Sequence, residues 1–131
     1  MNIIYLELED VLDIHQQQLE IFGGTPGVLS WDMLESAVAT PAAGFGETYF
    51  HENLYLMAAA YLFHLVRNHP FLDGNKRTGA VAAFDLLQIN GIDLRAGEGE
   101  FERLVRDAAE GKVKKEQIAE FFRQNSVEIN P

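Results

Sequence analysis

Apolar residues recur along most of this chain at the three- and four-residue spacing of one helix face. Residues 54–66 differ, because they are apolar on nearly every side, which is typical of a helix in the middle of a bundle. Elsewhere the spacing is set by Val11, Ile14, Leu19 and Phe22, by Leu34, Ala37 and Val38, by Ala80, Val81, Phe84 and Leu87, by Phe101, Leu104, Val105 and Ala108, and by Ile118, Phe121 and Phe122. The pattern predicts an all-α fold, a helical bundle of about six helices.

Glycine, proline and asparagine mark where the predicted helices end. These signals are Gly23-Gly24, Pro41, Pro70 and Asn90-Gly91. Between them, residues 42–53 are expected to form a loop, and residues 126–131 a frayed tail. With 131 residues the chain has the length of one domain, so we expect residues 1–131 to form a single domain.

Charge is distributed unevenly in this acidic chain. Twenty acidic and ten basic residues give a net charge of −10, which argues against non-specific binding to nucleic acid. Residues 1–66 contain nine acidic residues and no Lys or Arg, whereas Arg67 is followed closely by Lys76 and Arg77. Positive charge therefore begins in one short segment, which indicates an anionic ligand there.

The sequence also excludes several classes of site and segment. It contains no cysteine, so a disulfide scaffold, a cysteine-ligated metal and a thiol nucleophile are all excluded. The N-terminus has no basic start, and residues 54–66 are too short to span a bilayer. We therefore expect a cytoplasmic protein.

The most informative segment is the motif at residues 69–78, His-Pro-Phe-Leu-Asp-Gly-Asn-Lys-Arg-Thr. A helix is expected to begin near Asn75, so its free N–H groups and its dipole point into the preceding loop. Gly74 permits a positive φ angle, which lets such a loop form a nest for an anion. Lys76 and Arg77 lie in the first helical turn, where the dipole disfavours cations. A bound polyphosphate explains this placement.

Other residues of the motif have a chemical use beside such an anion. Asp73 is a hard oxygen ligand, and one carboxylate together with substrate phosphates is the usual way in which proteins hold Mg²⁺. His69 is a candidate general base for a substrate hydroxyl. Phe71 is expected to anchor the loop in the core. Two other interpretations are a capped, solvated turn without function, and a zinc site formed by His69 and Asp73 with His64.

The motif resembles the signature of the Fic/Doc family, H-P-F-x-D-G-N-x-R, and its Lys76 is similar to the Doc (death-on-curing) branch. Other landmarks of that branch follow in order over residues 5–123. They are Gly23-Gly24-Thr25-Pro26-Gly27, Leu34-Glu35-Ser36-Ala37, Pro41, Arg67-Asn68-His69 and Asn90-Gly91. The resemblance therefore extends over nearly the whole chain.

The resemblance implies a role for each residue of the motif. His69 would be the catalytic base, Asp73 would bind Mg²⁺ on the phosphates of ATP, and Phe71 would anchor the loop. The phosphates would be held by Gly74, Asn75, Lys76 and Arg77. Residues Tyr49 and Phe50 would belong to a flap that docks the target.

The resemblance also implies an activity and two partners. Doc proteins are toxins of toxin–antitoxin pairs and phosphorylate a threonine of elongation factor Tu, which stops translation, whereas Fic proteins generally transfer AMP. Here Lys76 replaces a small glycine of the Fic motif, and Ala80 replaces its second arginine. Both differences favour γ-phosphate transfer, with AMP transfer as the alternative. A Phd-like antitoxin is the expected partner, and an inactive, antitoxin-binding interaction module is the alternative of another class.

Overall fold

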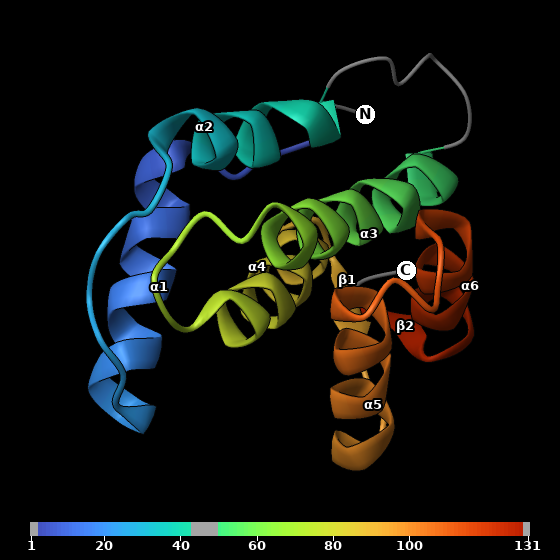
Figure 1. The fold of residues 1–131 in the computed structure, drawn as a ribbon. Coiled ribbons are helices and arrows are strands. Elements are labelled where there is room, and N and C mark those ends of the chain that lie inside the picture. The colour runs from blue at the N-terminus through green and yellow to red at the C-terminus, as the bar shows by residue number, and fades with distance from the viewer. Residues whose placement is uncertain (1–2, 43–49, 130–131) are drawn as a thin grey trace.

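The computed structural model describes residues 3–42 and 50–129, with only the backbone described at residues 42 and 50–53 (Figure 1). Six α-helices account for most of these residues, which confirms the predicted all-α fold. They are α1 (Leu8–Phe22), α2 (Trp31–Ala39), α3 (Phe50–Asn68), α4 (Asn75–Ile89), α5 (Glu98–Ala109) and α6 (Lys115–Gln124). A short 3-10 helix, η1 (Thr40–Ala42), follows α2, and two short strands, β1 (Ile92–Leu94) and β2 (Ser126–Glu128), complete the fold.

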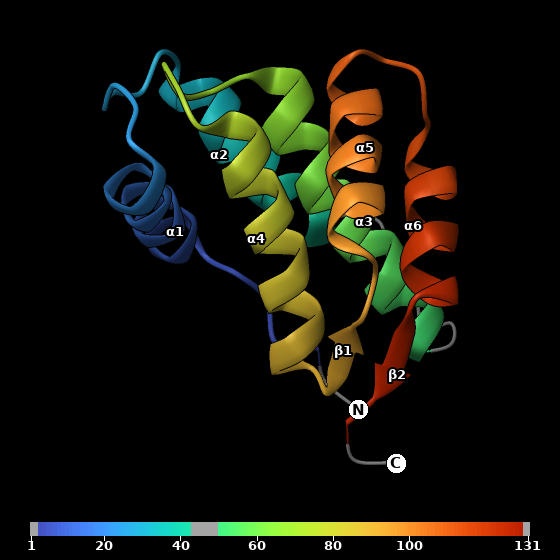
Figure 2. The same cartoon turned by 90° about the horizontal axis from the view of Figure 1, so that it is seen from below.

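Helix α3 lies at the centre of the bundle, as its nearly uniform apolar character predicts. It packs against α2, α4, α5 and α6, and Figure 2 shows α4 lying between α1 and α5. The side chains of Leu54, Met57, Tyr61, Leu62 and Leu65 are fully buried. This core fixes the C-terminal end of α3, from which the motif loop (residues 69–74) leads into α4.

A glycine allows α3 and α4 to approach closely beside the motif loop. Gly79 is buried, and a β-carbon at this position would lie 3.1 Å from Val66 Cγ1 and 3.3 Å from the Leu62 carbonyl oxygen. Such distances are shorter than ordinary van der Waals contacts. The position of the motif between the two helices therefore depends on a residue without a side chain.

The N-terminal segment is fixed by side chains from two helices. The Tyr61 hydroxyl donates to the Leu6 carbonyl oxygen at 3.0 Å and accepts from the Leu6 N–H at 3.2 Å. The Asn90 side chain donates to the Ile4 carbonyl oxygen at 2.9 Å and accepts from the Ile4 N–H at 2.8 Å. Burial, more than any neighbouring charge, raises the pKa of Tyr61 to about 12. The Tyr61 hydroxyl therefore stays protonated and able to donate.

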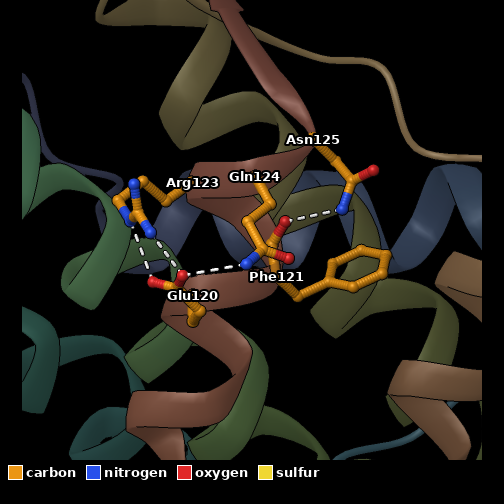
Figure 3. A network of polar contacts seen from close by, with 5 residues as sticks. All are labelled: Glu120, Phe121, Arg123, Gln124 and Asn125. Atoms are coloured by element: carbon orange, nitrogen blue, oxygen red, sulfur yellow. Dashed lines mark hydrogen bonds and ion pairs between the residues drawn. The ribbon is translucent and has the colours of Figure 1, made fainter.

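The two strands correct the expected frayed tail. β1 pairs antiparallel with β2, with Asp93 opposite Val127, so residues 126–128 are held against the body of the protein. The helix before each strand ends in the same way. The Asn90 side chain donates to the Leu86 carbonyl oxygen at 2.8 Å. The Asn125 side chain likewise donates to the Phe121 carbonyl oxygen at 2.8 Å, as Figure 3 shows. These bonds satisfy carbonyls that a helix C-terminus leaves free.

Two further expectations need correction. Residues 50–53 were expected to belong to a loop, but their backbone forms the first turn of α3. Phe22 was expected on the buried face of α1, but its side chain is 63% exposed, and His15 and Gln18 occupy that face instead. The error at Phe22 arises because tertiary packing, rather than local spacing, decides which residues of a helix are buried. No helix in the described parts of the chain combines the length and apolar character needed to cross a bilayer.

Candidate functional site

The motif borders a cleft of about 810 Å³ between three elements. The C-terminal end of α1 contributes Phe22, and α5, which lies beside α4 in Figure 2, contributes Phe101, Glu102 and Arg106. All six polar or glycine residues predicted for the site line this one cleft: His69, Asp73, Gly74, Asn75, Lys76 and Arg77. A cleft of this volume has the size of a typical small-molecule site.

Helix α4 begins at the floor of the cleft with its N–H groups uncapped. Gly74, at the N-cap, has φ +81° and ψ 14°, a left-handed conformation that favours glycine. It has no side chain that could cap the helix, so the first N–H groups of α4 lack an acceptor within the helix. Lys76 is exposed and Arg77 is half-buried at this positive end of the helix dipole. Free N–H groups and two cations together make the floor of the cleft suited to an anion.

Asn75 is buried beneath this surface and holds the motif loop together. Its Oδ1 accepts from the Phe71 N–H at 2.9 Å, and its Nδ2 donates to the Phe71 carbonyl oxygen at 2.9 Å. Phe71 itself is fully buried. The Asn75 side chain is therefore used inside the loop, and the part of this residue that remains available to an anion at the helix start is its backbone N–H.

The same amide fixes the ring of His69. Because the Phe71 N–H can only donate, the Asn75 Oδ1 is the acceptor, and its Nδ2 faces Nδ1 of His69 at 3.1 Å. Nδ1 must then accept, so a neutral His69 ring carries its proton on Nε2. His69 is exposed at the cleft and has φ +50°, a left-handed angle that non-glycine residues seldom adopt. Such strain is typical of functional positions.

The Asp73 carboxylate is oriented by two backbone N–H groups. Oδ2 accepts from the Thr25 N–H at 3.2 Å, and Oδ1 accepts from the Gly74 N–H at 2.9 Å. These two bonds, that from Thr25 first, lower the pKa of Asp73, and Arg77 adds to the effect. The carboxylate is thus ionised at neutral pH and exposed, with lone pairs left over for a metal ion. A single carboxylate of this kind fits Mg²⁺ bound mainly through phosphates.

Arg77 is held at the edge of the cleft by the end of α1. Its guanidinium donates to the Gly23 carbonyl oxygen at 3.1 Å and lies 5.1 Å from the centre of the Phe22 ring. The exposure of Phe22, unexpected from its helical spacing, is explained by this cation–π contact. The end of α1 is therefore part of the site.

Other candidate residues lie away from the cleft. His64 accepts from Lys115 of α6 at 3.2 Å, so it does not join His69 and Asp73 in a zinc site. Among the described residues, no three His, Asp or Glu side chains are grouped to hold a metal. Tyr49 lies outside the described residues. Phe50 begins α3, and its side chain is not described.

Sequence reasoning missed the contribution of α1 and of the turn after it. His15 and Thr25 bond to Asp73 of the motif loop, although they precede it by about 50 residues or more. A β-carbon at Gly24 would also meet Asp73. The Gly-Gly-Thr-Pro-Gly segment was noted only as the end of a helix and as a family landmark. A polar residue such as His15 at i+4 from Val11, on the buried face of α1, is the one signal that could have indicated a contact.

Comparison with known proteins identifies the family of the chain. Residues 5–87 match the Fic/DOC family, which is more than half of the chain, so the chain belongs to the Fic/DOC family. It is 42% identical over 92 residues to Toxin Doc of Mycolicibacterium smegmatis, which covers 70% of this chain and 68% of that protein. It is 26% identical over 120 residues to Protein kinase doc of Escherichia phage P1, which covers 92% and 94% respectively. The resemblance found in the sequence is thus confirmed.

Proposed function

We propose that this protein is a Doc-like toxin that transfers the γ-phosphate of ATP to a threonine or serine hydroxyl of a translation factor. The observation that carries the proposal is the convergence of His69, Asp73, Lys76 and Arg77 on one cleft at the uncapped start of α4. The names of the two relatives, a toxin and a protein kinase, support it. Elongation factor Tu is the proposed target, and its modification would block protein synthesis.

The start of α4 would bind the phosphates. The N–H groups of Asn75, Lys76 and Arg77 lie at the positive end of the helix, next to the Gly74 turn. The side chains of Lys76 and Arg77 would add two cations near the transferred phosphoryl group. Charge spreads over that group in the transition state, so fixed positive groups stabilise it more than they stabilise bound ATP.

Asp73 would hold Mg²⁺ on these phosphates. Its ionised and exposed carboxylate, fixed by the N–H groups of Thr25 and Gly74, is the hard oxygen ligand that the ion prefers. When bound, Mg²⁺ would neutralise phosphate charge in the cleft. The protein's part is to keep the carboxylate at the end of the loop, beside the first turn of α4.

His69 would accept the proton of the target hydroxyl. As the hydroxyl oxygen bonds to the γ-phosphorus, the bond from that phosphorus to the bridging oxygen breaks, and ADP leaves with the electron pair. In the described arrangement Nε2 carries a proton and Nδ1 faces Asn75. Either nitrogen can take the hydroxyl proton only after the contact between His69 and Asn75 breaks or reverses. Substrate binding must therefore alter this contact before transfer.

Two residues favour transfer of the γ-phosphate over transfer of AMP. Lys76 stands where the Fic motif has a small glycine, and it adds bulk and charge at the phosphate end of the cleft. Ala80, which lines the cleft, stands where the Fic motif has a second arginine. The floor of the cleft thus differs from the Fic pattern at both positions.

Labelled ATP distinguishes these activities. The protein is incubated with purified elongation factor Tu, and in parallel with a bacterial lysate, with ATP labelled at the α- or the γ-phosphate. Label transferred only from the γ-position is the expected result. Label transferred from the α-position would instead indicate AMP transfer, and the absence of label on any protein in either incubation would indicate an interaction module.

Replacement of His69 by asparagine tests its role with little change to the backbone. Asparagine tolerates the left-handed angle of position 69 better than alanine does, so the fold should be preserved. We expect transfer to fall by about 10²–10⁴-fold, the usual contribution of a general base. Transfer close to the wild-type rate by a folded His69→Asn protein would exclude His69 as the base.

We propose a Phd-like antitoxin as the partner that restrains this activity. Expression of the chain alone should arrest bacterial growth, and co-expression of an antitoxin encoded beside it should restore growth. The His69→Asn protein should cause no arrest but still co-purify with the antitoxin. A growth arrest that His69→Asn retains would show that toxicity does not depend on transfer.

A further inference from the structure

We infer that His15 of α1 is a positioning residue for the active-site loop, because it orients the Asp73 carboxylate through the peptide plane between Asp73 and Gly74. The inference rests on the proposed role of Asp73 in holding Mg²⁺ on the phosphates. His15 lies 58 residues before Asp73, outside the motif. Its side chain packs against Phe71 of the loop and does not line the cleft.

His15 is fixed in place by packing and by one hydrogen bond. Its ring stacks on Phe71 with ring centres 3.7 Å apart and an angle of 7° between the planes, and the residue is only 7% exposed. Its Nε2 lies 2.8 Å from the Asp73 carbonyl oxygen. Because a carbonyl can only accept, Nε2 must carry a proton and donate it. The bond therefore selects one tautomer of the neutral ring.

This bond determines the direction of the next N–H group along the chain. A trans peptide is planar, so the Asp73 carbonyl and the Gly74 N–H point in opposite directions. With the carbonyl held by His15, the Gly74 N–H points to Oδ1 of Asp73, to which it donates at 2.9 Å. His15 thus acts on the carboxylate through one rigid peptide unit.

The surroundings of Gly74 require this support. Gly74 has a left-handed φ of +81°, and a β-carbon there would lie 3.5 Å from His15 Cδ2. Glycine is the residue with the greatest conformational freedom, so a peptide that leads into it needs an external contact to fix its plane. The Thr25 N–H holds only the other oxygen of the carboxylate, Oδ2. Without His15, one of the two bonds that orient Asp73 loses its geometry.

Two substitutions separate the donor of His15 from its ring. His15→Phe keeps a ring that can stack on Phe71 but removes the donor. His15→Gln removes the ring but places an amide N–H at a similar reach. For His15→Phe we expect the Mg²⁺ concentration at half-maximal transfer from ATP to rise by about tenfold, the lower end of the usual loss when a residue supporting a metal ligand is changed. For His15→Gln this Mg²⁺ concentration should stay within about threefold of the wild-type value, which is below the usual range of loss.

Nuclear magnetic resonance provides a readout that does not depend on activity. Imidazole ¹⁵N shifts of the wild type should show His15 as the tautomer protonated at Nε2. The Gly74 amide resonance should move in His15→Phe and stay near its wild-type position in His15→Gln. If the wild type transfers no phosphate at all, the proposed function fails, whereas these spectra still decide the role of His15.

Three results would overturn the inference. The first is a wild-type His15 ring protonated at Nδ1 rather than Nε2, which requires no variant. The second is a His15→Phe protein with unchanged Mg²⁺ dependence and an unchanged Gly74 resonance. The third is a folded His15→Gln protein as impaired as His15→Phe, because the ring and not the donor would then be what matters.

Discussion

Single residues hold the motif loop in the conformation that faces the cleft. His69, Gly74 and Gly24 have φ angles of +50°, +81° and +128°, all in the region that disfavours a β-carbon. A side chain in that region costs roughly 1–2 kcal/mol for most residues. The buried contacts of Asn75 and Phe71 offset this strain. The loop should therefore be sensitive to small changes at these positions.

Gly23 and Gly24 provide a matched pair of substitutions. A β-carbon at Gly24 would lie 2.9 Å from Asp73 Oδ2 and 2.7 Å from Leu19 Cδ2, whereas nothing lies within 4 Å of one at Gly23. Both glycines have positive φ, so Gly23→Ala reports backbone strain, and Gly24→Ala reports strain together with the displacement of Asp73. We expect Gly24→Ala to reduce transfer at limiting Mg²⁺ by about tenfold relative to Gly23→Ala. Equal transfer rates in the two variants would contradict the described contact with Asp73.

Asn75→Ala should destabilise the whole protein. The change removes the partners of both the N–H and the carbonyl of buried Phe71, and each unsatisfied group costs about 1–3 kcal/mol. We expect the free energy of unfolding in urea to fall by about 2–4 kcal/mol. Lys76→Ala, at the exposed neighbouring position, is the control. It should be neutral or stabilise by about 0.3–1 kcal/mol, because it removes a cation from the positive end of α4.

At the scale of elements, the central helices were predictable and the contacts between distant segments were not. The apolar run of α3, the glycine before α4 and the asparagine after it are local signals, and the structure agrees with them. β1 and β2 have only three residues each, which is too short for a recognisable alternation of apolar and polar residues. They pair because the chain returns beside β1 after α6. The contacts of α1 with the motif loop likewise join segments about 50 residues or more apart. Periodicity carries no information about such pairs.

The attachment of the N-terminal segment to α3 tests one of these contacts. Tyr61→Phe removes a buried hydroxyl that bonds both the N–H and the carbonyl of Leu6. We expect a loss of about 1–3 kcal/mol in the free energy of unfolding, together with faster amide exchange at Leu6. Tyr5→Phe is the control, because Tyr5 is 42% exposed. A Tyr61→Phe protein as stable as Tyr5→Phe would show that the segment is held mainly by apolar packing.

At the scale of the whole molecule, all ten Lys and Arg residues lie in the second half of the chain. The cations of the motif gather at the cleft, whereas Lys115 of α6 contacts His64 on another side of α3. Arg67 does not line the cleft either, and it donates to the Ala109 carbonyl oxygen at the end of α5. α3 thus borders the cleft through Val66 and makes polar contacts with α5 and α6 through Arg67 and His64. The contact of His64 is expected to give the stability of the protein a dependence on pH.

Burial first, and then Lys115, lowers the pKa of His64 from its ordinary value of 6.5. Well above pH 6.5 the ring is neutral in both the folded and the unfolded chain, so its contribution to stability is complete. As the pH falls below 6.5, His64 becomes protonated in the unfolded chain but stays neutral in the folded chain, so the free energy of unfolding falls until the pH passes the lower pKa of the folded chain.

Urea unfolding of the wild type between about pH 7.5 and pH 5.5 should therefore show a decline in the free energy of unfolding that His64→Gln lacks. Lys115→Ala should retain a smaller decline, because burial of His64 remains. A decline of equal size in the wild type and in His64→Gln would assign the pH dependence to other groups, and the contact between α3 and α6 would then be insensitive to protons.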